Sequence, residues 1–102
     1  MNNDSFLYKV VDLTDNSTTI VSQKARLRGV YINTDISAQA VAIEDSGTTI
    51  FSIPASAIAG TWFEFGDTNF QTTLVVNPDD SATGSITVVY APDYSGLAGS
   101  GA

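Results

Sequence analysis

Short segments of alternating apolar and polar residues follow one another along the chain, separated by clusters of Gly, Asp, Asn, Ser and Pro. The segments are rich in Val, Ile, Thr, Phe and Tyr and recur about every ten residues, which is typical of an all-β protein. Strands are expected at residues 6–13, 18–23, 25–33, 39–45, 48–53, 61–66, 70–77 and 84–91. Seven to eight antiparallel strands with this alternation predict a single β-sandwich or a jelly-roll-like barrel.

The alternation also assigns side chains to faces and marks one tight turn. Val30 and Ile32 flank Tyr31, so the two aliphatic residues are expected in the core and the tyrosine on the outside. The dipeptide Ser46-Gly47 separates two strand segments. It predicts a hairpin, because glycine adopts the positive φ that such turns require.

One segment has features of a helix, and the chain ends in a different composition. Pro54 suits the first position of a helix and Gly60 a C-terminal cap, so we expect at most one short helix, near residues 55–59. The Gly, Ser and Ala residues at the C-terminal end have the composition of a flexible tail. The chain is long enough for one core only. The boundaries that we expect are 1–94 for the β-sandwich domain, with an N-terminal arm at 1–5, and 95–102 for the tail.

The composition removes most catalytic and metal-binding chemistry. The chain contains no His and no Cys, which supply the commonest general base, activated nucleophile and transition-metal ligands. Glu44-Asp45 and Asp79-Asp80 are pairs that could hold a hard cation or exchange protons, but both lie at predicted turns, where Asp bonds the local backbone. Asp67-Thr68-Asn69 resembles the start of a calcium loop but lacks the Gly and Glu that complete one. We therefore expect no enzyme, no catalytic residue, no cofactor and no metal site.

The charge argues against nucleic acid and membranes as partners. Eleven acidic and four basic residues give a net charge of −7, which opposes binding to phosphate backbones and to anionic lipid. No apolar run approaches the roughly 20 residues of a membrane span. The start Met1-Asn2-Asn3-Asp4 lacks the basic region and apolar stretch of a signal peptide. We expect the chain to be made in a cytoplasm and to stay soluble there until it assembles.

Two features are candidates for contact with another protein. Lys24, Arg26 and Arg28 recur with period two, so on a strand they would project from one face. They are either a docking stripe for an acidic subunit or solvated charges that protect a strand from unwanted pairing. Trp62 points to the opposite side of its strand from the phenylalanines beside it. It is either an exposed contact residue or is buried against the short helix or the N-terminal arm.

Three segments carry a resemblance to known proteins: RLRGVYIN at 26–33, GTWFEFGD at 60–67 and LVVNPDDSATG at 74–84. Through them, the stretch 27–91 resembles small virion proteins of tailed bacteriophages, especially marine ones. The resemblance implies a head decoration or cement protein that is made in the host cytoplasm and binds the major capsid protein, or other virion proteins, at the capsid surface. It also implies an oligomer, for which a trimer would suit the three-fold positions of the lattice. The resemblance assigns no catalytic or binding residue.

Two other classes of function stay open on the sequence. A carbohydrate-binding module, or a head-fibre or tail-adaptor module, would use Trp62 with Tyr31 or Tyr94 to stack on sugars. A glycosidase would need two carboxylates at a defined separation, and the sequence places none in apolar surroundings that would raise the pKa of one of them.

Overall fold

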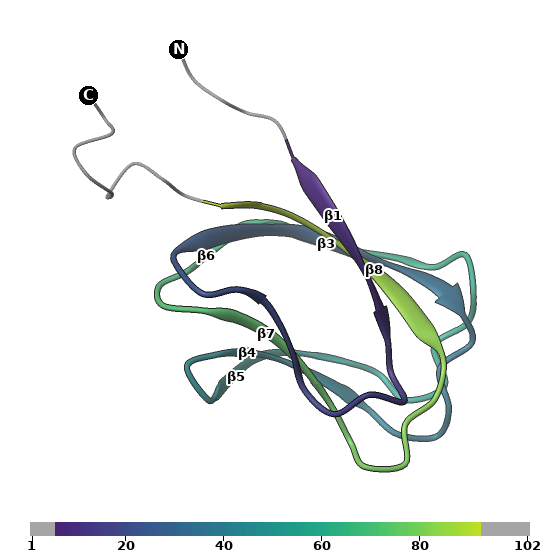
Figure 1. Ribbon diagram of the computed structural model, residues 1–102. Helices are drawn as coiled ribbons and strands as arrows, with labels where there is room; N and C mark the ends of the chain where they lie inside the picture. Colours follow the sequence, from purple (N-terminus) through teal and green to yellow (C-terminus); the bar gives the residue numbers. More distant parts are fainter. Residues whose placement is uncertain (1–5, 93–102) are drawn as a thin grey trace, which may run out of the picture.

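The computed structural model describes residues 6–92, which form eight strands and no helix. The predicted arm at 1–5 and tail at 95–102 lie outside the described residues. The strands are β1 (Leu7–Asp12), β2 (Thr18–Val21), β3 (Ala25–Thr34), β4 (Val41–Asp45), β5 (Thr48–Ile53), β6 (Trp62–Phe70), β7 (Leu74–Pro78) and β8 (Ser85–Pro92). They build two antiparallel sheets that pack face to face (Figure 1). The fold is therefore the all-β sandwich that the sequence predicts.

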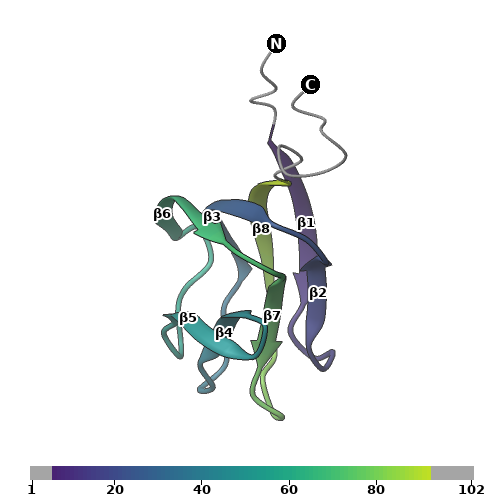
Figure 2. The ribbon, with the colours of Figure 1, turned by 90° about the vertical axis from the view of Figure 1, so that its left-hand side faces the viewer.

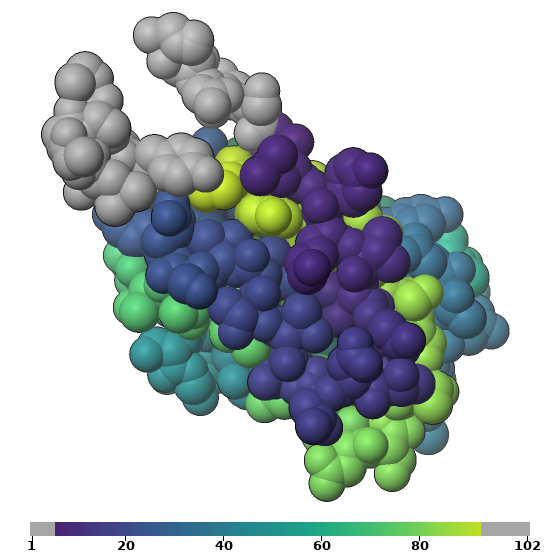
Figure 3. All heavy atoms as spheres, viewed as in Figure 1, coloured from purple at the N-terminus to yellow at the C-terminus, as the bar shows by residue number. Residues whose placement is uncertain are grey.

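Each sheet contains four strands, and most connections pass from one sheet to the other. Sheet A has the order β1-β8-β3-β6, and sheet B has the order β2-β7-β4-β5 (Figure 2). Strands β1, β6, β2 and β5 are therefore the edges of the sandwich. The atoms of β1 lie at the surface on the side that Figure 3 shows. No helix of the described part is long and apolar enough to cross a membrane.

Alternate side chains of the central strands fill the space between the sheets. On β3, Leu27, Val30 and Ile32 are fully buried whereas Tyr31 is exposed, which confirms the predicted faces. Burial of each such aliphatic side chain contributes about 1.5–3 kcal/mol. The remaining fully buried large side chains come from both sheets: Val11, Leu13, Val41, Ile43, Ile53, Phe70, Leu74, Val76, Ile86 and Val88. This shared core holds the two sheets together.

The hairpin predicted at Ser46-Gly47 is confirmed. Both residues have positive φ, 51° and 87°, and they link β4 to β5 with Asp45 opposite Thr48. A two-residue turn with two positive φ values matches the right-handed twist of the strands that it joins.

The segment near residues 55–59, for which the sequence predicts at most one short helix, forms turns. Its backbone bonds to a neighbouring loop rather than to itself: Ser56 N–H donates to Ser37 O at 2.8 Å, and Ile36 N–H donates to Ala57 O at 2.8 Å. Ser56 also has a φ of 63°, outside the helical region. These bonds tie the segment to the end of β3.

The strand predicted at 61–66 is longer in the structure, and the one predicted at 70–77 starts later, at Leu74. Strand β6 does not end at Gly66, because Gly66 and Asp67, with φ of 62° and 61°, form a bulge within the ladder rather than a turn. Beyond the bulge, β6 continues to Phe70, which is fully buried. The chain then turns before β7.

Candidate functional site

A shallow depression on the outer side of sheet B gathers several carboxylates. Its volume is about 630 Å³, and its lining residues are Gln39, Ala42, Glu44, Thr49, Asn77, Pro78, Asp79, Asp80 and Ser81. Glu44 Oε2 accepts a hydrogen bond from Asn77 Nδ2 at 3.0 Å, while Asp79 and Asp80 are exposed. Among residues 6–92, no three His, Cys, Asp or Glu side chains are placed to hold a metal ion. The depression is a polar surface rather than an enclosed site.

Asp45, the last residue of β4, binds a turn through its carboxylate and does not line the depression. Its Oδ2 accepts from Gln71 N–H at 2.7 Å, and its Oδ1 accepts from Thr72 and Thr73 N–H at 3.0 and 3.1 Å. Burial alone would raise the pKa of Asp45, but the three backbone hydrogen bonds outweigh it and hold the pKa below its usual 3.8. The pair Glu44-Asp45 is therefore divided between the depression and this turn, which separates β6 from β7.

Replacing Asp45 by asparagine is expected to lower the free energy of unfolding at neutral pH by about 1 kcal/mol, because an amide offers one acceptor oxygen to three N–H donors. The pKa of Asp45 is lower in the folded protein. Its contribution is therefore complete above the unfolded value of 3.8 and is lost as the pH falls through the folded value. Urea unfolding of the wild type and Asp45→Asn measures the difference between their free energies of unfolding. It is carried out once at neutral pH and once at a pH well below 3.8. An equal difference at both pH values would contradict the assignment.

The outer face of sheet A differs from that of sheet B, because large apolar side chains are exposed on three of its strands. Val10, Thr87, Tyr31 and Trp62 lie side by side in one row across β1, β8, β3 and β6. We define the apolar face as the exposed residues Tyr8, Val10, Tyr31 and Trp62 of this surface together with the half-buried Val89. Four of them leave between 42% and 72% of their surface exposed. Large exposed apolar patches are typical of interaction sites in proteins.

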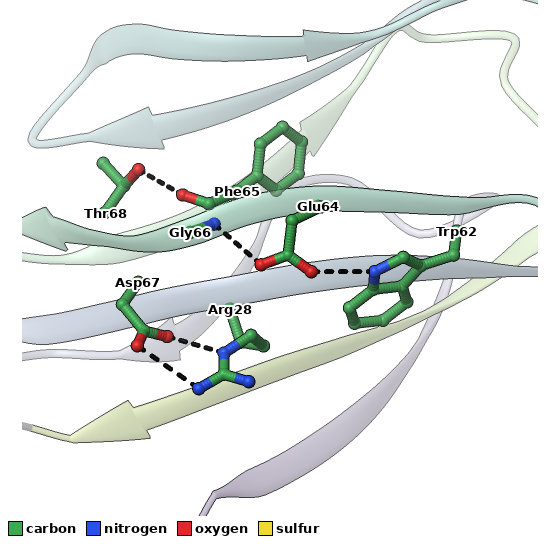
Figure 4. Close-up of polar contacts among 7 residues, drawn as sticks. All are labelled: Arg28, Trp62, Glu64, Phe65, Gly66, Asp67 and Thr68. Carbon is green, nitrogen blue, oxygen red and sulfur yellow. Dashed lines mark hydrogen bonds and ion pairs between the residues drawn. The ribbon is translucent and has the colours of Figure 1, made fainter.

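Trp62 is fixed in place at one end of the apolar face. Its Nε1–H donates to Glu64 Oε1 at 3.0 Å, and Glu64 Oε2 accepts from Gly66 N–H at 3.1 Å (Figure 4). The six-membered ring of the indole lies against Gly29, where a Cβ atom would come within 2.3 Å of Trp62 Cζ2. The structure thus places Trp62 in exposed surroundings, with 42% of its surface accessible. It rests on the sheet, and the alternative of burial against a helix does not apply.

The basic residues of the predicted stripe are divided between two environments. Arg26 and Arg28 project from the outer face of β3, as their period predicts, and Lys24 is exposed just before the strand. Arg28 binds both carboxylate oxygens of Asp67, with Nε–Oδ1 at 2.7 Å and Nη2–Oδ2 at 3.2 Å (Figure 4). This hydrogen bonding is the main cause that lowers the pKa of Asp67 and raises that of Arg28. Arg26 and Lys24 form no salt bridge with any residue that the structure describes.

Phe6 connects the apolar face with these cations. Its ring centroid lies 4.3 Å from Cζ of Arg28 and 5.7 Å from Cζ of Arg26, within the range of cation–π attraction. The outer face of sheet A therefore has an apolar centre, with two arginines at the end where β1 begins.

Sequence reasoning did not single out Tyr8 and Val10, the most exposed members of the apolar face. The available signal was that apolar residues occur twice in succession within one strand, at Leu7-Tyr8 and at Val10-Val11. A strand with apolar residues on both faces has one face more than a single core can bury. Of these side chains only Val11 is buried.

The remaining predicted contact residue, Tyr94, lies outside the described residues. Comparisons were made with models of known protein families, with curated proteins and with solved structures. No family model, no curated protein and no solved structure matches this chain.

Proposed function

We propose that this chain is a non-enzymatic structural protein of a tailed-phage virion, specifically a head decoration protein that binds and stabilises the major capsid lattice. The observation that carries the proposal is the apolar face, which spreads exposed aromatic and aliphatic side chains over adjacent strands of sheet A. The resemblance of residues 27–91 to tailed-phage virion proteins supplies the class of particle. On this proposal the protein is made in the host cytoplasm and acts at the capsid surface.

The composition of the apolar face supports docking against another protein. Tyr31 provides aromatic contact area near its middle and Trp62 at its β6 end, while Arg26 and Glu64 lie at its margins. Aromatic centres with polar rims are typical of protein–protein interfaces. The side chains stand on a paired sheet, and Trp62 is held by Glu64 and by its contact with Gly29. A face ordered in advance loses little conformational entropy on binding.

The distribution of charge supports one orientation on the lattice. All four cations lie on strands of sheet A or directly before one: Lys9, Lys24, Arg26 and Arg28. The depression on the outer side of sheet B contains Glu44, Asp79 and Asp80. On the outer face of sheet A, Asp67 neutralises Arg28, whereas Arg26 and Lys24 form no salt bridge with a described residue. A capsid surface with carboxylates opposite Arg26 and Lys24 would attract that end of sheet A and repel the outer side of sheet B. On this proposal, sheet A faces the lattice and sheet B faces solvent.

The experiment that tests this docking compares two substitutions that add the same charge to opposite faces. Tyr31→Glu places a carboxylate in the apolar face, and Thr49→Glu places one on the outer side of sheet B. We expect heads assembled without this protein to bind the wild type and Thr49→Glu alike. Tyr31→Glu should bind at least about tenfold more weakly, a loss of about 1.4 kcal/mol. Equal binding of the two variants, with both folded, would contradict docking through the apolar face.

A second candidate function, carbohydrate binding at a head fibre or tail adaptor, is favoured by one observation. Tyr31 and Trp62 are direct cross-strand neighbours and both are exposed, and adjacent exposed aromatic rings can stack on sugars. Glycan-array binding that disappears in a folded Trp62→Ala variant would support this function. Absence of binding to every glycan would remove it.

A further inference from the structure

The four edge strands of the sandwich differ in how regularly they pair. Strands β2, β5 and β6 each contain extra residues that shift the register against their neighbour. Such bulges twist an edge and discourage the addition of another strand. Strand β1 pairs with β8 through six consecutive residue pairs without a shift. Of the edges that the structure describes, only β1 is uninterrupted.

The hydrogen-bond alternation identifies the backbone groups that β1 leaves unpaired. Leu13 N–H donates to Gly84 O at 2.9 Å, directly beyond the last pair of the β1–β8 ladder. Hydrogen-bonded pairs alternate along an antiparallel ladder. Val11, Lys9 and Leu7, at intervals of two before Leu13, therefore point their N–H and C=O groups at β8. The residues of β1 that point theirs at the open edge are Tyr8, Val10 and Asp12. Of these groups, Asp12 O accepts from Asp15 N–H at 3.1 Å.

The side chains of β1 are also uncovered. Leu7, Tyr8 and Val10 expose 47%, 72% and 58% of their surface, and they lie on both faces of the strand. In Figure 3 the atoms of β1 form an open part of the molecular surface. The same strand thus combines exposed apolar side chains with backbone N–H and C=O groups of Tyr8 and Val10 that have no hydrogen-bond partner among residues 6–92.

We propose that β1 pairs with β1 of a second copy of this chain, antiparallel and about a two-fold axis, so that sheet A continues from one copy into the other. A strand edge is complementary to itself under two-fold symmetry, which makes such an interface isologous. The edge is also neutral, since β1 carries one cation and one carboxylate, Lys9 and Asp12. The net charge of −7 therefore does not gather at this contact.

The charges on β1 select the register of the pair. An axis at Lys9 would put the two lysines directly opposite each other, where like charges are destabilising. An axis at Tyr8 would leave Asp12 outside the ladder. An axis at Val10 places Tyr8 opposite Asp12 of the second copy and Lys9 opposite Val11, so that no like charges face each other. This register also uses all three outward-facing residues of β1.

The pairing has a structural consequence for the apolar face. Tyr8 and Val10 are its members on β1, so the two apolar faces would meet along the joined edge and form one surface. The inference stands independently of capsid binding. It also differs from the trimer that would suit the three-fold positions of a capsid lattice, because pairing of one edge with itself joins copies in twos.

The test measures molar mass by light scattering and backbone amide hydrogen exchange in the same samples. The wild type should have the mass of a dimer, with slow exchange at the amides of Tyr8 and Val10. Val10→Pro removes an N–H that points outward and leaves the β1–β8 bonds in place, so it should be monomeric and folded. Val10→Thr has a similar shape and keeps the N–H, so it should remain a dimer.

Two results would overturn the proposal. One is a wild type that is still monomeric at about 1 mM. A dissociation constant of about 1 mM corresponds to an association free energy of about 4 kcal/mol. The other is a folded Val10→Pro variant that dimerises as well as the wild type. If Val10→Pro does not fold, the exchange pattern of the wild type decides. Fast exchange at Tyr8 and Val10, beside slow exchange at Lys9 and Val11, would then contradict the pairing.

Discussion

Replacing Phe70 by alanine is expected to lower the free energy of unfolding by about 3–5 kcal/mol. Phe70 ends β6 opposite Ala25 and has no exposed surface. Its ring centroid lies 6.4 Å from that of Phe51, which comes from the other sheet. Alanine would leave a cavity between the sheets. The total stability of a domain is about 5–15 kcal/mol, so this single change removes a large part of it.

The control for Phe70→Ala removes an apolar side chain from the surface. Ile58 lies in the loop before β6 and exposes 63% of its surface. Ile58→Ala should change stability by no more than about 0.5 kcal/mol. Urea unfolding of the three proteins measures the effects. A loss below about 1 kcal/mol for Phe70→Ala would mean that the core is not packed as described.

Gly84→Ala is expected to have the second largest effect, a loss of about 3 kcal/mol, because two penalties combine. Gly84 has a φ of 115°, which side chains other than glycine rarely adopt. A Cβ atom there would also lie 2.6 Å from Asp35 O and 3.2 Å from Ile36 Cα. Both contacts are with backbone, so no side-chain rotation relieves them.

A matched glycine separates the two penalties. Gly47 also has a positive φ, 87°, but a Cβ atom there would meet nothing within 4 Å. Gly47→Ala should therefore lose only about 1 kcal/mol, the strain of the backbone conformation alone. Thermal or urea unfolding compares the two variants. Equal losses would contradict the close packing of Gly84 on the end of β3.

Local patterns in the sequence predict the strands but not their neighbours. The alternation around Tyr31 and the turn at Ser46-Gly47 depend on adjacent residues, so both are predictable. The pairing of Leu7 with Tyr90 joins opposite ends of the chain, and the backbone bonds that form it leave no pattern in either segment. The turns at 55–59 depend on bonds to the end of β3 for the same reason.

In the candidate site too, features set by neighbouring residues were predictable, and contacts between distant residues were not. The period of Arg26 and Arg28 predicts their common face, but the partner of Arg28 lies 39 positions away and is brought to it by the bulge in β6. The direction of Trp62 was predictable from alternation. Its contact with Gly29 was not, because the glycine that leaves room for the indole lies on another strand.

The asymmetry of the sandwich links the fold to the proposed function. Sheet A carries the cations and the apolar face, and the outer side of sheet B carries a polar depression with carboxylates. Both sheets share one core, so neither face requires a change of fold to bind. A decoration protein needs a rigid body with one adhesive side. On the proposed function, the outer side of sheet B would be the side that faces away from the lattice.

The most direct measurement of the central claim is the number of copies of this chain in purified phage particles, determined by quantitative mass spectrometry against the major capsid protein. The account predicts a fixed ratio to the capsid protein in wild-type particles. It predicts a much lower ratio for phage that encode Tyr31→Glu, whose heads should rupture at lower temperature. A protein that is abundant in infected cells but absent from purified virions would contradict the account.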